Sequence, residues 1–337
     1  MDAHLVKEVV HENISTKKRL EYIDLAKGVC ITLVIIGHTG LSITIPGLDA
    51  VRMPLYFILS GLFFKDYGGL GHLFKKKFNK ILFPFLFFYL TAYVVFYTVE
   101  YLLPGFMTTG ARGIADIWTQ RQYFNGPIWF LLALFWANIM FCIISLLINN
   151  LYFQGLIVII IGCFGAYLGL KYVFLPFMID SAMTALPFFW FGYVLKKTPI
   201  LYPNRYDRFN VLISFALYGL VVLSYYVLGN NYVGFHNNNV CGNYPFILVI
   251  STLGVISILL LCKSIKTLPF LTFFGRYSII PLCTHHLVYR PLALVIDRDT
   301  LWGELSVALL TLAICAALIP LFRRFLPWAV AQKDIWK

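Results

Sequence analysis

The stretch from Glu21 to Thr39 reads EYIDLAKGVCITLVIIGHT and indicates both the class of fold and the chemistry. Its length is close to the ~20 residues that cross a hydrocarbon core of about 30 Å as an α-helix. Backbone amides inside lipid must be paired within the structure, so an apolar stretch of this length is expected to be helical. Within it, Asp24, Lys27 and His38 interrupt the apolar pattern.

These three side chains are predicted to share one face of the helix. At about 100° per residue, Lys27 and His38 lie within about 20° of each other, and Asp24 lies within about 40° of His38. His38 is expected roughly 16 Å further along the axis than Lys27. Asp24 and Lys27 could simply pair at i,i+3, with Lys27 extending to the interface. A histidine deep in a span is costly and usually functional, and Gly37 beside it permits close approach.

The rest of the chain extends the same pattern. Hydrophobic residues make up 60% of the 337 residues and charged residues 12%, whereas soluble domains are roughly half apolar and about a quarter charged. We therefore expect an all-α, polytopic membrane protein with about ten transmembrane helices in one bundle. The predicted spans are 23–45, 52–65, 81–103, 127–148, 155–172, 176–195, 210–228, 245–262, 271–292 and 301–322.

The basic residues predict the orientation of this bundle. Of the 27 Lys and Arg residues, 19 fall in the tails and connections on one side of the ten-span plan and five on the other. Positive charge favours the cytoplasmic side, so residues 1–22 and 323–337 are expected to be cytoplasmic tails around a single domain, 23–322. The net charge of +12 then reflects topology, not nucleic-acid binding. The first span is expected to be retained as an anchor in the plasma (inner) membrane.

The cysteines argue against a metal site. Six of the seven lie within predicted spans, and Cys241 alone lies in a loop. A disulfide framework or a paired-cysteine metal site needs a different spacing. We expect no metal ion.

Several motifs together resemble a known family. Lys27-x10-His38, preceded by Asp24-Leu-Ala, resembles the Arg/Lys-x10-His signature of the acyltransferase-3 family of membrane O-acyltransferases, and in particular its fucose 4-O-acetylase-like branch. Five further segments resemble the family's phrases in the same order: Met53–Gly61, Lys77-x-x-Lys80, Pro127–Leu131, Phe189–Leu195 and Phe274–Ser278 followed by His285. Together they cover nearly the whole chain.

The chain also departs from the family pattern. Lysines stand where arginines are usual in both basic motifs, and a lysine cannot form the bidentate fork to phosphate. Tyr56 replaces a common phenylalanine, which we expect to matter little. The tandem His285-His286 leaves open which imidazole faces a cavity.

The resemblance implies transfer of an acyl group, usually acetyl, from cytoplasmic acyl-CoA to a hydroxyl of a carbohydrate or glycan. Acetyl-CoA would be a co-substrate, and no cofactor would be permanently bound. Membrane lipid would surround the protein as a further partner. His38 would be the general base. The assigned site residues are His38, Asp24 and Lys27 for catalysis, Lys77, Lys80, Arg52 and Ser60 for the donor, and Trp129, Arg276, Ser278 and His285 for the acceptor or the oxyanion.

Other interpretations remain open. The lysines could act only in topology and lipid contact, Ser60 could be a packing residue beside Gly61, and Arg52 and Arg276 could be charges at helix ends. A serine nucleophile would give an acyl-enzyme, although the chain has no G-x-S-x-G elbow. A transporter or flippase of glycans or lipids is the rival class, and a silent binding protein is a third. Acidic residues in spans are scarce and no repeat of broken helices is seen, which disfavours transport.

Overall fold

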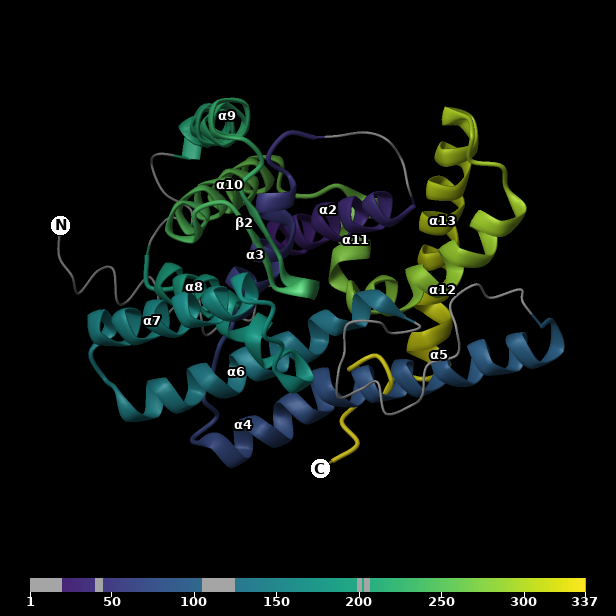
Figure 1. Cartoon of the computed structure of the whole chain (residues 1–337), viewed down its shortest axis with the longest axis horizontal. Coiled ribbons are helices and arrows are strands. Elements are labelled where there is room, and N and C mark those ends of the chain that lie inside the picture. The colour runs from purple at the N-terminus through teal and green to yellow at the C-terminus, as the bar shows by residue number, and fades with distance from the viewer. Residues whose placement is uncertain (1–19, 40–44, 105–124, 199–201, 203–206, 337) are drawn as a thin grey trace.

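The computed structural model of the chain describes residues 20–39, 45–104, 125–198, 202 and 207–336. In these residues the chain is helical apart from one two-stranded hairpin (Figure 1). The longer helices are α2 (Glu21–His38), α3 (Asp49–Leu62), α5 (Phe83–Leu102), α6 (Trp129–Leu147), α7 (Leu151–Leu170), α8 (Ile179–Leu195), α9 (Asn210–Leu228), α10 (Tyr244–Ile265), α12 (Ile279–Val295) and α13 (Leu301–Phe325). The shorter ones are α4 (Leu70–Lys77) and α11 (Pro269–Arg276).

Seven helical segments in the described part of the chain are long and apolar enough to cross a membrane. They are Leu70–Leu102, Gly126–Leu147, Leu151–Leu170, Pro176–Leu195, Asp207–Leu228, Tyr244–Ile265 and Leu301–Phe325. Helix α3 has 14 residues and α12 has 17, and α2 has 18 but carries three charged side chains. The all-α, multi-pass architecture is confirmed, whereas the count of ten spans and the cytoplasmic termini stay predictions.

Several predicted spans differ from the observed helices in their bounds: the span predicted as 23–45, for example, corresponds to α2, which ends at His38. Two of them also differ in how the helix is built. The segment predicted as 271–292 is divided into α11 and α12 by a break at Tyr277 and Ser278. Pro281 has no N–H to continue a helix through this point and is tolerated in a first turn. The segment predicted as 81–103 begins earlier, because α4 runs through a π-helical turn, Phe78–Leu82, into α5. Pro84, the second residue after that turn, has no N–H and cannot donate to the carbonyl of Lys80.

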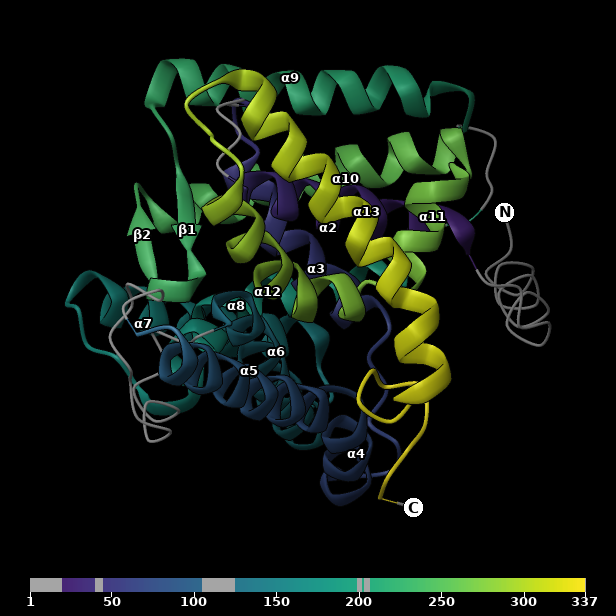
Figure 2. The same ribbon diagram turned by 90° about the vertical axis from the view of Figure 1, so that its right-hand side faces the viewer.

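The hairpin is an element that the sequence did not predict. Strand β1 (Tyr232–Gly234) pairs antiparallel with β2 (Asn239–Cys241), with Val233 opposite Val240. The turn between them, η7 (Phe235–Asn237), is a 3-10 turn. Figure 2 shows the hairpin far from α4 and from the segment that follows α13.

Helix α2 lies in the middle of the bundle (Figure 1), in contact with α3, α10, α11, α12 and α13. Its close contact with α11 depends on two glycines, one on each helix. A methyl group on Gly28 would overlap a backbone carbonyl of α11, and one on Gly275 would overlap a carbonyl of α2. Gly61 and Gly192 form the same reciprocal contact between α3 and α8. Small residues at such crossings let helix backbones approach closely, which fixes where the side chains of α2 and α3 point.

Candidate active site

His38 opens onto a cavity of about 360 Å³, here called the His38 cavity. Helices α2, α3 and α6 and the hairpin form its walls. The lining combines aromatic rings with groups that can form hydrogen bonds. The lining residues are Val34, Gly37, His38, Asp49, Arg52, Met53, Pro127, Trp129, Phe130, Tyr232, Val233, Gly234, Phe235, His236, Asn237, Asn239 and Leu282.

Two further imidazoles lie against His38. The ring of His285 is 5.3 Å from that of His38 between centroids, and the ring of His286 is 5.8 Å away. His285 is completely buried, His286 is half-buried, and His38 is exposed. α12 contributes Leu282 to the cavity lining, whereas neither His285 nor His286 is among the lining residues. Of these three histidines, His38 is therefore the one that a molecule bound in the cavity would meet.

Arg52 supplies positive charge beside His38. Its guanidinium forms an ion pair with Asp49, one turn earlier on α3. A methyl group at Gly37 would collide with the same guanidinium, so the glycine before His38 makes room for Arg52. Arg52 was assigned to the donor from sequence, and the structure places it with His38, in a different cavity from Lys77. A cation at this position could stabilise a developing oxyanion.

A second cavity of about 200 Å³, the Lys27 cavity, adjoins the first turns of α2. Lys27, Lys77 and Ser60 meet here from three different helices, α2, α4 and α3. The Lys27 ammonium also lies 5.2 Å above the ring of Phe63. The lining residues are Lys27, Tyr56, Leu59, Ser60, Phe63, Lys77, Ile81, Leu134 and Asn138.

A pair of aromatic rings separates the two cavities. Tyr56 lines the Lys27 cavity, Phe130 lines the His38 cavity, and their ring centroids are 5.5 Å apart. The Tyr56 hydroxyl donates to the Lys27 carbonyl at 3.1 Å. The tyrosine at position 56, expected to matter little, thus has a bonded hydroxyl where the family's common phenylalanine would have none. Helices α2, α3 and α6 run past both cavities.

Asp24 lies apart from both cavities. Its carboxylate is almost fully buried and is 3.6 Å from the Arg276 guanidinium of α11. Arg276 also approaches Glu21, at 3.5 Å. The expected single polar face of α2 is therefore divided, because α11 packs against the side of α2 that carries Asp24. Asp24 and Arg276 connect these two helices and line neither cavity.

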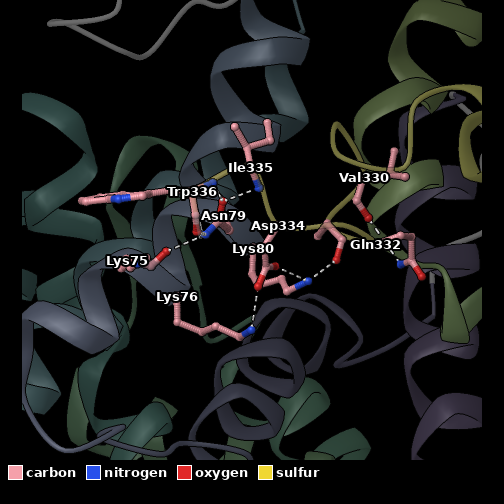
Figure 3. A network of polar contacts seen from close by, with 10 residues as sticks. Lys75, Lys76, Asn79, Lys80, Val330, Gln332, Asp334, Ile335 and Trp336 are labelled. Carbon is pink, nitrogen blue, oxygen red and sulfur yellow. Dashed lines mark hydrogen bonds and ion pairs between the residues drawn. The ribbon is translucent and has the colours of Figure 1, made fainter.

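Lys80 is engaged by the segment that follows α13 (Figure 3). Asp334 forms ion pairs with Lys80 at 2.8 Å and with Lys76 at 2.9 Å, and Lys80 also donates to the Ala331 carbonyl. The Lys80 and Lys76 ammonium groups hold the pKa of Asp334 below its ordinary value. The Asn79 side chain bonds both α4 and the C-terminal segment: its amide nitrogen donates to the Lys75 carbonyl, and its oxygen accepts from the amide of Ile335. The basic pair predicted from sequence is thus divided, with Lys77 in the Lys27 cavity and Lys80 against Asp334.

The structure adds residues that sequence reasoning missed. His236 lies 5.9 Å from Trp129 between ring centroids, and it enters the His38 cavity together with Tyr232, Asn237 and Asn239 of the hairpin. The polar run of residues 229–243, between two long apolar stretches, was a usable signal for such a loop element. Asn138, an amide inside an apolar helix, was a comparable signal for the Lys27 cavity.

No group of three or more His, Cys, Asp or Glu side chains that could hold a metal ion occurs in the described residues. The two cavities instead offer lysine ammonium groups in one and an imidazole with a guanidinium in the other. This combination suits binding of an anionic molecule beside a proton-transfer site.

Comparison with known proteins assigns the family. A family model described as an acyltransferase domain, that of the acyltransferase-3 family, matches residues 20–320. No curated protein and no solved structure matches the chain. With seven segments able to cross a membrane and a match over most of its length, the chain belongs to the acyltransferase-3 family of membrane acyltransferases.

Proposed function

We propose that the chain transfers an acetyl group from acetyl-CoA to a hydroxyl of a carbohydrate at the plasma (inner) membrane, with His38 as the general base. One observation carries this proposal: the same three helices line a lysine-containing cavity and a histidine-containing cavity, separated by the Tyr56–Phe130 contact. Lys27 and His38 are about 16 Å apart along α2. A long, flexible acyl carrier held at its charged end could span that distance.

The donor would bind at the Lys27 cavity. CoA carries phosphate groups at one end and the acyl thioester at the other, and lysine binds phosphate as a point charge. Lys27 and Lys77 line this cavity, together with the polar side chains of Ser60 and Asn138. The excess of basic residues on this side of the ten-span plan supports a cytoplasmic donor.

The acceptor would bind at the His38 cavity. Sugar rings present CH faces that pack on aromatic rings and hydroxyls that need hydrogen-bond partners. Trp129 of α6 and Tyr232 of the hairpin supply rings, and Asn237 and Asn239 of the hairpin supply amide groups. Such a lining fits a neutral polyhydroxy molecule better than an apolar one.

The arrangement favours direct transfer. A serine nucleophile would need His38 within hydrogen-bond reach, but Ser60 lines the Lys27 cavity and His38 lines the other. We therefore propose that His38 takes the proton of the acceptor hydroxyl while its oxygen attacks the thioester carbonyl. Arg52 would stabilise the oxyanion, and the CoA thiolate would leave and recover the proton.

The test is acetyl transfer by the purified protein, measured as CoA thiol release from acetyl-CoA in the presence of a panel of methyl glycosides. General-base catalysis contributes about 10²–10⁴-fold, so His38→Ala should lower kcat by that factor. His38→Gln should not restore the rate, because an amide cannot take up a proton near neutral pH. CoA binding is the folding control and should be retained.

Wild-type turnover in His38→Ala would remove the base from this residue. If CoA binds but no glycoside leads to thiol release, acetyl transfer is not the function. Transport or simple binding would then be the better interpretation.

A further inference from the structure

His285, which the family resemblance assigned to the acceptor or the oxyanion, is a buried histidine that the transfer step proposed above does not use. It lies on α12 with a fully buried side chain, directly behind His38. The turn that precedes α6 is bonded to α12, because the Asn125 side chain donates to the carbonyl of Cys283 at 2.6 Å. Helix α12 also packs against α2, and these contacts together position the ring of His285 relative to His38.

A single hydrogen bond determines which nitrogen of His285 carries the proton. Nδ1 is 2.7 Å from the carbonyl oxygen of Pro281. A carbonyl can only accept, so Nδ1 must donate, and in the neutral ring Nε2 is then a bare acceptor. Nε2 is buried, and none of the described groups donates to it. A buried acceptor without a donor costs free energy, which makes the nearest available donor important.

The ring of His38 is at the right distance to be that donor. Two imidazoles joined by a straight N–H···N bond of about 2.9 Å have centroids about 5.3 Å apart, since each ring nitrogen lies roughly 1.2 Å from its centre. The observed centroid distance is 5.3 Å, with the ring planes tilted by 42°. Rotation of the exposed His38 ring about its χ2 bond would align the bond without moving the backbone.

We propose that His285 is a positioning residue: its Nε2 accepts a hydrogen bond from one ring nitrogen of His38, so that the other nitrogen is unprotonated and directed into the His38 cavity. The inference rests on the proposed function of His38 as the base. It explains how a histidine pair can replace the histidine–carboxylate arrangement found in other acyl-transfer sites.

The proton then has a defined route. The bare nitrogen of His38 takes the proton from the acceptor hydroxyl as the new C–O bond forms at the thioester carbonyl. The positive charge on His38 is stabilised through the N–H that it donates to His285. When the C–S bond breaks, the CoA thiolate takes the proton from the same nitrogen, and His38 returns to its starting state. His285 gains and loses no proton in this sequence.

His286 is less suited to the same task. Its ring is 5.8 Å from that of His38 and also contacts Tyr289, at 5.9 Å. It is half-buried, whereas the side chain of His285 is fully buried, and the His286 ring lies farther from His38 than that of His285 does. His286 therefore serves as a comparison for the effect of removing a nearby ring.

The first test uses the full chain in lipid nanodiscs, with acetyl-CoA and the methyl glycosides as substrates. His285→Phe removes the hydrogen-bond acceptor Nε2 but keeps an aromatic ring. It should lower kcat about 10- to 100-fold with the KM for acetyl-CoA unchanged. His285→Gln should recover most of the rate, because its side-chain oxygen can accept a hydrogen bond at the position of Nε2. Thr284→Val, a buried neighbour whose hydroxyl donates to the Ile280 carbonyl, is the packing control and should retain kcat.

A second test does not depend on turnover. In ring-nitrogen NMR of ¹⁵N-histidine-labelled protein, His38 should populate one tautomer in the wild type and a mixture in His285→Phe, with its signals assigned from His38→Gln. A wild-type mixture of tautomers at His38 would overturn the inference. Equal loss of kcat in the Phe and Gln variants, or none in the Phe variant, would overturn it as well. A single tautomer in a protein without transferase activity would support the positioning contact and contradict the proposed function instead.

Discussion

Replacing Lys77 and Lys80 separately by glutamine should have different consequences, although the sequence presents them as one basic pair. Lys77 lines the Lys27 cavity, where the donor is proposed to bind. Lys80 contacts Asp334 and the Ala331 carbonyl, about one helical turn further along. The two variants remove the same charge from the same segment, so each is the matched control for the other.

The expected magnitudes follow from these surroundings. A charge-assisted hydrogen bond between lysine and a phosphate contributes about 1.5–3 kcal/mol, and each 1.4 kcal/mol is about tenfold in affinity. Lys77→Gln should therefore raise the Kd for CoA about 10- to 100-fold. The side chain of Lys80 is one-third exposed, at 33%, and ion pairs of this kind contribute about 0–1 kcal/mol. Lys80→Gln should loosen the segment around Asp334 and leave the Kd for CoA nearly unchanged.

Isothermal titration of the purified variants with CoA measures both effects, with thermal unfolding as the control for folding. Titration with pantetheine, which has no phosphate, should abolish the difference between Lys77→Gln and wild type. Equal losses of CoA affinity in the two variants would refute the division of the basic pair. A loss at Lys77 that persists with pantetheine would show that this side chain does not act through phosphate.

Four further predictions concern the bundle and its sites. Gly61→Ala should lower the free energy of unfolding by about 1–3 kcal/mol, measured by thermal unfolding, because the methyl group meets a carbonyl of α8. Gly37→Ala should lower kcat with little change in melting temperature, because the methyl group displaces only the end of the Arg52 side chain. The pKa of Asp334 is lowered in the folded protein, so its ion pairs with Lys76 and Lys80 contribute fully to docking of the C-terminal segment at pH values above the ordinary pKa of about 3.9. This contribution is lost as the pH falls through the lower folded pKa. Amide hydrogen exchange at residues 335 and 336 would detect the loss. In a cysteine-free background, single cysteines at positions 205 (outside the described residues) and 236 should label from opposite sides of sealed vesicles, and labelling from one side would contradict the ten-span plan.

Much of the candidate site could be located from one helix and its motifs. The 11-residue spacing of Lys27 and His38 indicated two polar positions on α2, and each proves to line a cavity. Ser60 and Trp129, which the motifs assigned to the donor and to the acceptor or oxyanion, also line cavities, and their roles stay predictions. The donor assignment of Arg52 is not supported by its place beside His38.

Other site features depended on contacts between helices. The sequence left open which histidine of the tandem pair faces the cavity. In the structure both rings lie against His38 and neither lines the His38 cavity. Tyr56 gained a role because α6 brings the ring of Phe130 against it. The hairpin was missed because its strands have three residues each, too few for a periodic pattern.

By itself, the sequence determined the membrane-helical class, because the length and charge of an apolar segment decide whether it can enter lipid without reference to its neighbours. It also determined which ionisable groups share α2, since helical geometry follows from spacing alone. Only the tertiary structure decided which of these groups meet. Gly28 and Gly275 let α11 approach the side of α2 that carries Asp24, which assigns that carboxylate to Arg276 and leaves Lys27 and His38 to the cavities. Close packing between helices depends on residues far apart in the chain, and no local pattern contains that information.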